Sequence, residues 1–405
     1  MKKLRMRIFT LLTVICLLMG LCLPISAQGS SGAEQTAQGE GQSAASDLGI
    51  ADGSLELACK SAVLMEANTG TVLYRQNPSE ALPPASVTKI MTLLLVMEAI
   101  DVGTLRMDDT VTVSANAASM GGSQVYLKEG ERMTIEDLLK SVVIASANDA
   151  AVALAEHIAG SVTAFVKKMN ERAAELGMED TRFENVTGLD DTAEHHLTSA
   201  HDIALMSRAL IEHKTILEYS SIWMDSIRNG EFGLTNTNRL VRFYQGCTGL
   251  KTGSTAKAGF CVSVTAERDG VSLICVIMGA ESRDARNAMA TQLLDWGFAN
   301  FAVYHAEEGA FDPIPVIGGA QNLCAVSHGA FSVVLPKGAI GGVEVSVELP
   351  TRLTAPIKHG DQIGTLNFLS GGKTVGSVPI TAESDVDRIN FFQILERMAA
   401  GFTLI

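Results

Sequence analysis

The chain carries the stretch Leu82-Pro-Pro-Ala-Ser-Val-Thr-Lys-Ile-Met-Thr-Leu-Leu-Leu-Val-Met-Glu-Ala-Ile100, in which two prolines precede a long apolar run. The prolines end any earlier helix, and the run predicts a buried helix that begins near Ser86. Ser86 and Lys89 are three residues apart and therefore share one face of that helix. Because apolar surroundings disfavour a charged amine, Lys89 is a candidate base for the Ser86 hydroxyl. Taken alone, the four residues also fit a helix-capping serine followed by a solvated lysine.

The tripeptide Ser-Ala-Asn occurs twice, at Ser114-Ala115-Asn116 and at Ser146-Ala147-Asn148. The first copy follows the alternating Val111-Thr112-Val113, and we expect it to be a turn or a helix cap. The second copy interrupts an amphipathic helical pattern, where polar side chains need partners or face a cleft. Ser146 and Asn148 are therefore candidate site residues.

A third short element, Lys251-Thr252-Gly253-Ser254, leads into a predicted strand. A lysine among small residues at a sheet edge can bind a substrate carboxylate, while the glycine lets the backbone approach the substrate. The same residues alone would also fit a surface loop. The later Lys373-Thr374-Val375 lacks the glycine, so we do not assign it to the site.

Two predicted β-hairpins flank these elements, and the sequence between them is mostly helical. The expected strands are 60–66 with 71–75, and 258–266 with 271–279, the second pair joined by Asp269-Gly270. Apolar residues recur at helical spacing over 135–158, with a possible break near Ser146, and over 162–176, 199–213 and 286–300. We expect an α+β fold in which both hairpins share one antiparallel sheet, helices cover it, and a helical lobe is inserted between them.

The C-terminal part has a different pattern of apolar and polar residues. Alternating segments at 331–335, 343–349 and 365–368 predict a small all-β domain. Residues 384–405 carry one apolar stripe and predict an amphipathic helix on a membrane surface, with packing against the β domain as the alternative. Its charged side chains sum to −1, so apolar burial must supply the membrane affinity. The stripe consists of Val386, Ile389, Phe392, Leu395, Met398, Phe402 and Ile405.

The first residues are typical of an export signal. Four basic residues precede an apolar run over 8–23, and Ser26 with Ala27 fits a cleavage site. An uncleaved membrane anchor is the alternative, and Cys22 does not fit a lipoprotein site because Leu21 precedes it. We expect a signal peptide over 1–27, a flexible linker over 28–48, a catalytic domain over 49–303, a β-rich domain over 304–383 and the terminal helix over 384–405.

The net charge disfavours nucleic-acid binding, and the cysteine pattern disfavours a disulfide framework. The net charge is −14, and removal of the leader with its four basic residues would leave −18, which disfavours nucleic-acid binding. The five cysteines outside the leader form no disulfide framework. In the second hairpin Arg268 should oppose Val271, so Cys275 opposes Val264 and Cys261 lies on the other face. No spacing indicates a metal site, and no cofactor is expected.

Taken together, the elements resemble a known family. From about Ala58 to Asn300 the chain resembles the catalytic domain of the serine D-alanyl-D-alanine carboxypeptidases, the low-molecular-mass penicillin-binding proteins, which implies a β-lactamase/transpeptidase-like fold. The tail, including Ala355-Pro-Ile-Lys-His-Gly-Asp-Gln-Ile-Gly-Thr365, also resembles this family, with its β domain and membrane-surface helix. The matching motifs are Pro84-Ala-Ser-Val-Thr-Lys-Ile-Met91, Gly122-Ser123, Ser146-Ala-Asn-Asp-Ala150, Phe183-x-Asn-x-x-Gly-Leu-Asp190, His196-x-x-Ser-Ala-x-Asp202, Asn236-Thr-Asn238 and Gly249-Leu-Lys-Thr-Gly253.

The resemblance implies a role for each candidate residue. Ser86 would be the acylated nucleophile, Lys89 its general base and Ser146 a proton relay to the departing amine. Asn148 would hold the substrate peptide, Lys251, Thr252 and Gly253 would meet its carboxylate end, and the N–H groups of Ser86 and Ser254 would form the oxyanion hole. The implied reaction removes the terminal D-alanine from peptidoglycan pentapeptide stems at the outer face of the cytoplasmic membrane. Penicillins would acylate the same serine.

Three other functions fit part of the pattern. A class A β-lactamase also forms a serine acyl-enzyme, but it needs a glutamate, usually in Glu-x-x-x-Asn, and here Phe183 follows Glu179 and Gly188 follows Glu184 at that spacing. A catalytically silent wall-binding protein could keep the fold, but the intact site residues argue against it, namely Ser86, Lys89, Ser146, Asn148 and Lys251. Endopeptidase or transpeptidase activity would use the same chemistry with another acceptor or leaving group.

Overall fold

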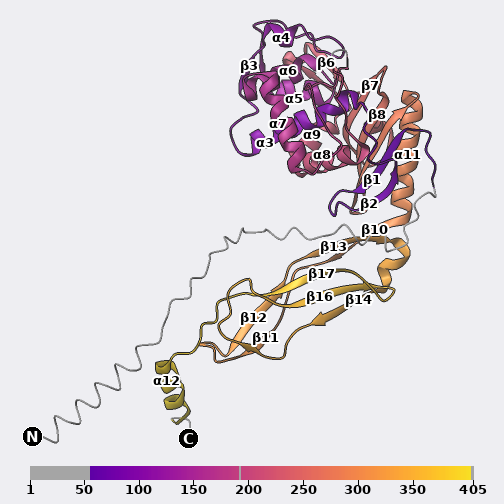
Figure 1. Ribbon diagram of the computed structural model, residues 1–405. Helices are drawn as coiled ribbons and strands as arrows, with labels where there is room; N and C mark the ends of the chain where they lie inside the picture. Colours follow the sequence, from indigo (N-terminus) through magenta and orange to yellow (C-terminus); the bar gives the residue numbers. More distant parts are fainter. Residues whose placement is uncertain (1–54, 191–192, 403–405) are drawn as a thin grey trace, which may run out of the picture. The chain divides into compact units, whose positions relative to one another are not determined.

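The structure, a computed structural model, describes residues 55–190 and 193–402 (Figure 1). The predicted signal peptide over 1–27 and the predicted linker over 28–48 lie outside these described residues.

A five-stranded antiparallel sheet has the spatial order β2-β1-β9-β8-β7. Because β1 pairs with β9, the two predicted hairpins do form one sheet. In the second hairpin Arg268 opposes Val271 and Cys275 opposes Val264, so the expected register is confirmed. Its turn residues Asp269 and Gly270 both have positive φ, as a tight two-residue hairpin turn requires. The strands are β1 (Ser61–Glu66), β2 (Val72–Gln76), β7 (Cys247–Thr255), β8 (Gly259–Arg268) and β9 (Val271–Ala280).

Helices cover both faces of this sheet, and Figure 1 shows α11 (Arg283–Asn300) on one side and the helical lobe on the other. Alternate residues of β1 divide between two cores: Val63 and Met65 pack with the lobe, whereas Ala62 and Leu64 pack with α11. This alternation follows from the two-residue period of a strand. The main lobe helices are α3 (Lys89–Asp101), α5 (Ile135–Val143), α6 (Asn148–Ala159), α7 (Val162–Glu175) and α8 (Ala200–Glu212).

Short elements complete the catalytic region. The first Ser-Ala-Asn copy is a cap, as expected, because the Ser114 hydroxyl accepts a hydrogen bond from the Ala117 N–H. The short elements are β3 (Thr110–Thr112), α4 (Ala115–Ala118), β4 (Arg132–Thr134), α9 (Thr215–Ser220), β5 (Met224–Ile227), the 3-10 turn η2 (Arg228–Gly230), β6 (Phe232–Thr235) and α10 (Leu240–Phe243).

The helix expected to begin near Ser86 has an irregular first turn. Ala85–Thr88 forms the 3-10 helix η1, and α3 begins only at Lys89. Ala85 has a φ of 49°, in the left-handed region that side chains other than glycine rarely adopt. Ser86 therefore lies on a tight turn at the head of the buried helix rather than inside its first α-helical turn.

The cysteines fulfil the expectation drawn from the sequence. Cys261 packs in the core on the lobe side and Cys275 in the core on the α11 side, so the two thiols lie on opposite faces of the sheet. All five cysteines in the described part of the chain are free thiols.

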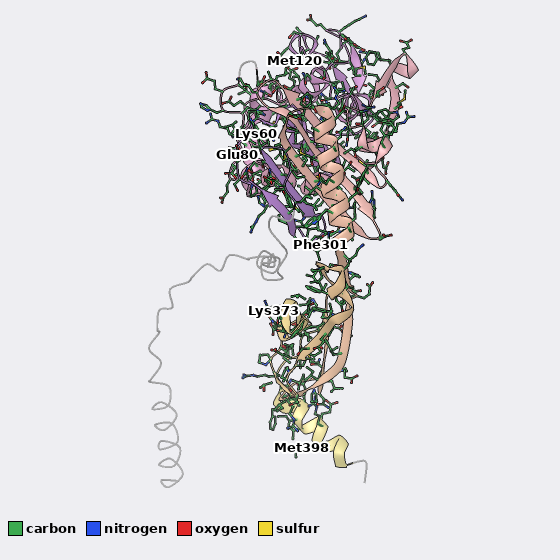
Figure 2. The ribbon with its side chains drawn as sticks, turned by 90° about the vertical axis from the view of Figure 1, so that its right-hand side faces the viewer. Lys60, Glu80, Met120, Phe301, Lys373 and Met398 are labelled. Carbon is green, nitrogen blue, oxygen red and sulfur yellow. The ribbon has the colours of Figure 1, made fainter. Side chains whose placement is uncertain are left out.

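The C-terminal β domain contains a six-stranded sheet, β14-β16-β17-β12-β11-β15, and a two-stranded sheet, β10-β13. Figure 2 labels Phe301, the residue at which α11 gives way to β10. The predicted segments at 331–335, 343–349 and 365–368 correspond to β13, β14 and part of β16. The bounds are β10 (Phe301–Ala306), β11 (Gly309–Ile317), β12 (Leu323–His328), β13 (Phe331–Pro336), the 3-10 helix η3 (Lys337–Gly342), β14 (Val343–Glu348), β15 (Leu353–Thr354), β16 (Gln362–Ser370) and β17 (Lys373–Ala382).

The terminal helix begins later than predicted, because α12 (Phe391–Phe402) starts at Phe391 and not near residue 384. Val386 belongs to the β domain instead: it is buried, and its N–H and C=O both pair with Ile357 at 2.9 and 3.0 Å. A residue held in such a ladder cannot also continue a helix. Asn390 and Gln393 then exchange hydrogen bonds between side chain and backbone, a reciprocal cap that sets the helix start.

On the described part of α12 the apolar side chains are exposed, and Figure 2 labels one of them, Met398. The exposed group is Phe391, Phe392, Ile394, Leu395 and Met398. Among the described residues no single helix is long and apolar enough to cross a bilayer, and α6 with α7 meets that test only as a pair bent by 84°.

Candidate active site

Ser86 and Lys89 lie together at the head of α3. The Lys89 Nζ atom is 2.8 Å from the Ser86 Oγ atom and donates to the Thr187 carbonyl at 2.9 Å. The Lys89 side chain is fully buried. Burial lowers the pKa of Lys89 well below its usual value, the nearby Lys251 lowers it further, and Asp149 acts in the opposite direction. An uncharged amine in contact with a serine hydroxyl can accept its proton.

Strand β7 brings the third element against this pair. A Cβ atom added to Gly253 would lie 2.7 Å from the Ser86 nitrogen, 2.8 Å from the Pro84 oxygen and 2.9 Å from the Val87 nitrogen. Only glycine allows this approach of two backbones. The side chains of Lys251 and Thr252 on the same strand are buried, and Ser254 is exposed beside them.

Lys251 is influenced by a second buried cation, Arg286, whose position the sequence did not indicate. Its Nζ atom donates to the Thr252 carbonyl at 3.1 Å. Burial, with a further contribution from Arg286, lowers the pKa of Lys251 to about 7. Arg286 lies in the first turn of α11, is itself buried, and donates to the Cys261 carbonyl at 3.3 Å. An arginine opening a predicted amphipathic helix carries no signal of such a position, so reasoning from the sequence missed it.

The second Ser-Ala-Asn copy forms the predicted break between α5 and α6. Ser146 is buried with a φ of 62°, and Asn148 is the first residue of α6. Asn148 is fixed by two short bonds, from its N–H to the Ser123 carbonyl and from Nδ2 to the Gly121 carbonyl, both 2.7 Å. Its Oδ1 is a buried acceptor with no partner among the described residues. That oxygen is free to accept from a bound peptide or from a rearranged neighbour.

The break is linked to β7 through one residue. The Thr237 N–H donates to the Ile144 carbonyl at 3.0 Å, and the Thr252 hydroxyl donates to the Thr237 hydroxyl at 2.9 Å. Within the described residues no hydrogen bond joins the Ser146 hydroxyl to Ser86 or Lys89, so the relay role of Ser146 stays a prediction.

The loop at 183–190 supports the base. Asn185 Oδ1 accepts from the Thr187 and Gly188 N–H groups at 3.1 and 2.7 Å, which aims the Thr187 carbonyl at Lys89. Gly188 has a φ of 80°, and a Cβ atom there would lie 1.8 Å from the Ala85 oxygen. The glycine of the Asn-x-x-Gly motif is therefore required by its contact with the turn that carries Ser86.

His196 is linked to the same turn through the Thr88 hydroxyl. Its Nδ1 accepts from the Glu184 N–H at 3.0 Å, so Nε2 carries the proton and donates to the Thr88 hydroxyl at 2.8 Å. That hydroxyl donates to the Ala85 carbonyl at 2.8 Å. Burial lowers the pKa of His196 to about 4, so the ring is neutral at pH 7.

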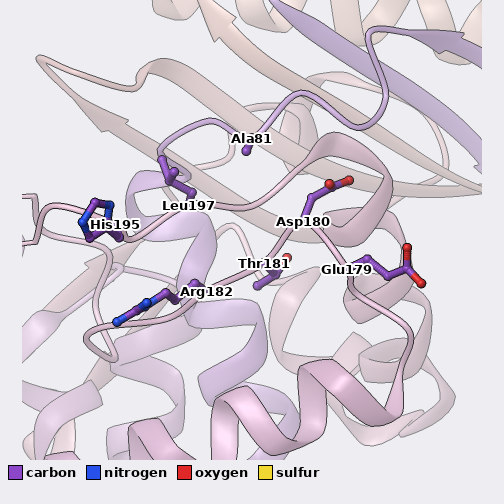
Figure 3. A pocket seen from close by; sticks show the side chains of 7 residues that line it. All are labelled: Ala81, Glu179, Asp180, Thr181, Arg182, His195 and Leu197. Atoms are coloured by element: carbon purple, nitrogen blue, oxygen red, sulfur yellow. The ribbon is translucent and has the colours of Figure 1, made fainter.

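Figure 3 shows a surface pocket that includes His195 and Leu197, the two chain neighbours of His196. It contains none of the candidate site residues, and part of its wall is the backbone pairing of Arg182 with Leu197. In the described part of the chain no group of three or more His, Cys, Asp or Glu side chains is arranged to hold a metal ion. The pocket is lined by Ala81, Glu179, Asp180, Thr181, Arg182, His195 and Leu197.

Comparisons with known proteins agree with this arrangement. Residues 48–282 match the family model described as D-alanyl-D-alanine carboxypeptidase, and residues 298–388 match the C-terminal domain of penicillin-binding protein 5. The chain is 40% identical over 351 residues to the D-alanyl-D-alanine carboxypeptidase DacF of Bacillus subtilis, covering 85% of this chain and 90% of that protein. It is 35% identical over 341 residues to DacC of Escherichia coli, covering 82% and 84%.

Solved structures give the same result. Penicillin-binding protein 5 from Haemophilus influenzae superposes with a TM-score of 0.75 at 30% identity, covering 82% of this chain and 99% of that one. Penicillin-binding protein D2 from Listeria monocytogenes, solved in its ampicillin-bound form, superposes with a TM-score of 0.55 at 31% identity, covering 60% and 99%.

Proposed function

Because this chain belongs to the D-alanyl-D-alanine carboxypeptidase family, a family of serine peptidases, we propose that Ser86 is the nucleophile with which it removes the terminal D-alanine of peptidoglycan pentapeptide stems. The chain is a carboxypeptidase of this family, with a penicillin-binding catalytic fold and a C-terminal β domain. The observation that carries the assignment is the 2.8 Å contact between Ser86 Oγ and the fully buried Nζ of Lys89.

Acylation follows from this geometry. Uncharged Lys89 takes the Ser86 proton while Oγ attacks the carbonyl carbon of the penultimate D-alanine. The substrate carboxylate would bind Lys251 and Thr252, which places the scissile carbonyl beside Ser86 because Gly253 already contacts its backbone. The N–H groups of Ser86 and Ser254 would stabilise the oxyanion.

The intermediate then collapses by breaking the carbon–nitrogen bond. The departing D-alanine amine takes a proton from the Ser146 hydroxyl, which is resupplied by the protonated Lys89. Water attacks the Ser86 ester while Lys89 takes its proton. The bond between the acyl carbon and Oγ then breaks, Lys89 returns the proton to Oγ, and the shortened stem leaves with a free carboxylate. Asn148, with its unpartnered Oδ1, would hold the peptide on the acyl side.

The direct test is incubation of the full mature chain with a pentapeptide stem. D-alanine should be released with a tetrapeptide as the other product, and Ser86→Ala should release none. Benzylpenicillin should form a long-lived adduct in the same preparation. Rapid penicillin turnover without D-alanine release would favour the β-lactamase alternative and contradict the proposal.

The cellular location is a further part of this proposal. The basic and apolar N-terminal pattern supports export, and the exposed apolar side chains of α12 support attachment of the chain to the outer face of the cytoplasmic membrane. In that location the active site would have access to peptidoglycan stems.

A further inference from the structure

Tyr126 has an unusual combination of backbone and side-chain features close to the proposed active site. Its φ is 58°, in the left-handed region, and the residue is 66% exposed. An aromatic residue in this conformation costs conformational energy, which the surrounding structure must offset. The ring gains little burial in return, so neither core packing nor backbone preference explains a tyrosine here.

Two buried or half-buried charges fix the backbone of Tyr126 from both sides. The residues flanking it, Val125 and Leu127, both donate their N–H groups to the Asp149 carboxylate, at 3.1 and 3.0 Å to its Oδ2 atom. Asp149 follows Asn148 in the Ser-Ala-Asn-Asp motif and is completely buried. The tyrosine is therefore positioned by the same motif that would hold the substrate peptide.

Arg228 supplies the second clamp. Its guanidinium donates to the Val125 carbonyl at 3.0 Å and to the Tyr126 carbonyl at 3.4 Å. It also donates to Glu131 at 2.7 Å and lies 5.3 Å from the centre of the Phe232 ring. The Phe232 ring in turn meets the Tyr126 ring edge-on, with centres 6.3 Å apart. The result is a two-ring surface, here called the aromatic rim, held in place by one arginine.

The aromatic rim is connected to the proposed site by the loop over 121–126. Gly121 and Ser123 accept from Asn148, so the loop that carries Tyr126 begins in contact with the residue assigned to the substrate peptide. Three residues of extended chain span at most about 10 Å, so Tyr126 is within reach of the stem residues that precede the D-alanyl-D-alanine end. An extended stem that leaves Asn148 along this loop would pass over the rings.

We propose that the Tyr126 and Phe232 rings form a subsite for the peptide part of the stem upstream of D-alanyl-D-alanine. The inference rests on the proposed function and deepens it by naming the part of the substrate that the rim binds, the extended peptide that precedes D-alanyl-D-alanine. Aromatic rings offer large contact area at little conformational cost, which suits a rim that must bind and release substrate.

The test compares two substrates that share the D-alanyl-D-alanine end and differ only in the residues that precede it. One is acetyl-D-alanyl-D-alanine, which contains the reacting end alone, and the other is the pentapeptide with lysine at its third position. The variants are Tyr126→Ala, Tyr126→Phe and Tyr126→Gly, the last because glycine accepts the positive φ and so removes the ring without adding strain. The matched control is Phe243→Ala, whose ring on α10 has the same exposed fraction of 66%.

Loss of the ring should raise KM for the pentapeptide by about tenfold and leave kcat/KM for the short substrate unchanged. Tyr126→Phe and Phe243→Ala should behave as the wild type on both. The inference is overturned if KM for the pentapeptide does not change in the ring-removal variants, or if both substrates lose activity equally. A wild-type chain that releases D-alanine from neither substrate would overturn the proposed function itself.

Discussion

The pKa of the buried Lys89 amine beside the Ser86 hydroxyl is lowered by causes that can be traced to individual groups. Water cannot solvate the Lys89 amine, and the positive charge of Lys251 opposes a second one nearby. Both effects favour the form that can accept a proton. The Ser-x-x-Lys spacing predicted the pairing, because any helical turn brings these positions together. It could not predict the Thr187 carbonyl, which comes from a loop almost a hundred residues away.

Removal of the base should stop acylation. Replacement of Lys89 by alanine is expected to slow acylation by a fluorescent penicillin by about a thousandfold at pH 7.5, since general base catalysis contributes factors of this order. The fold should survive, because the change removes a buried amine and leaves Ser86 in place. Circular dichroism provides the folding control. Acylation at the wild-type rate in a folded Lys89→Ala chain would remove the assignment.

The charge of Lys251 should control substrate binding in the physiological range. With a pKa of about 7 in the free site, Lys251 is charged below pH 7 and loses its proton as the pH rises through this value. The substrate carboxylate binds the charged form, so KM for the pentapeptide should rise about fivefold from pH 7 to pH 8. In Lys251→Arg the side chain stays charged and KM should be flat over this range. A wild-type KM that does not change between pH 6 and pH 8 would contradict this.

At the scale of elements, the absence of a side chain at Gly253 allows β7 to approach η1 closely. The sequence predicted the sheet and the hairpin register, because strand alternation and the Asp269-Gly270 turn are local signals. It predicted the head of α3 less well, since the 3-10 turn depends on packing of Gly188 and Gly253 against it from distant segments. It also placed the start of α12 too early, because the pairing of Val386 with Ile357 is a tertiary contact that overrides an apolar period.

The contact at Gly253 should not tolerate a methyl group. In Gly253→Ala the Cβ atom would meet the backbone of η1 at 2.7 to 2.9 Å, so β7 must move away from Ser86. Penicillin acylation should fall by about a hundredfold or more, since small displacements of reacting groups have effects of this size. The control is Gly329→Ala in the β domain, where an added Cβ atom meets nothing within 4 Å, and its rate should match the wild type. Equal rates for the two variants would show that the contact does not position the site.

At the scale of the whole molecule, the two family matches cover the catalytic region up to residue 282 and all strands of the β domain. Most of α11 lies between the two matches, and the second match stops at residue 388, before α12. The order of the motifs along the chain predicted the family, and the long-range pairing of β1 with β9 explains why motifs so far apart meet in one site. The effect of Arg286 on Lys251 and the hydrogen bond between His196 and Thr88 join residues that are far apart in the sequence. No local pattern predicts such contacts, so only the structure could reveal them.

The terminal helix gives a prediction about the intact cell. Deletion of residues 391–405 should move the protein from the membrane fraction to the soluble fraction, because it removes the exposed apolar side chains of α12. D-alanine release from a soluble pentapeptide should be unchanged, which is the control for folding. If the shortened protein stays with the membrane, the attachment lies elsewhere, for example in an uncleaved N-terminal segment.

The most direct measurement of the central claim is mass spectrometry of the full mature chain after incubation with benzylpenicillin. The penicilloyl group should be found on the peptide that contains Ser86. The same preparation should release D-alanine from the pentapeptide, and both activities should disappear in Ser86→Ala. An adduct on any other residue, or D-alanine release that persists in the variant, would contradict the account.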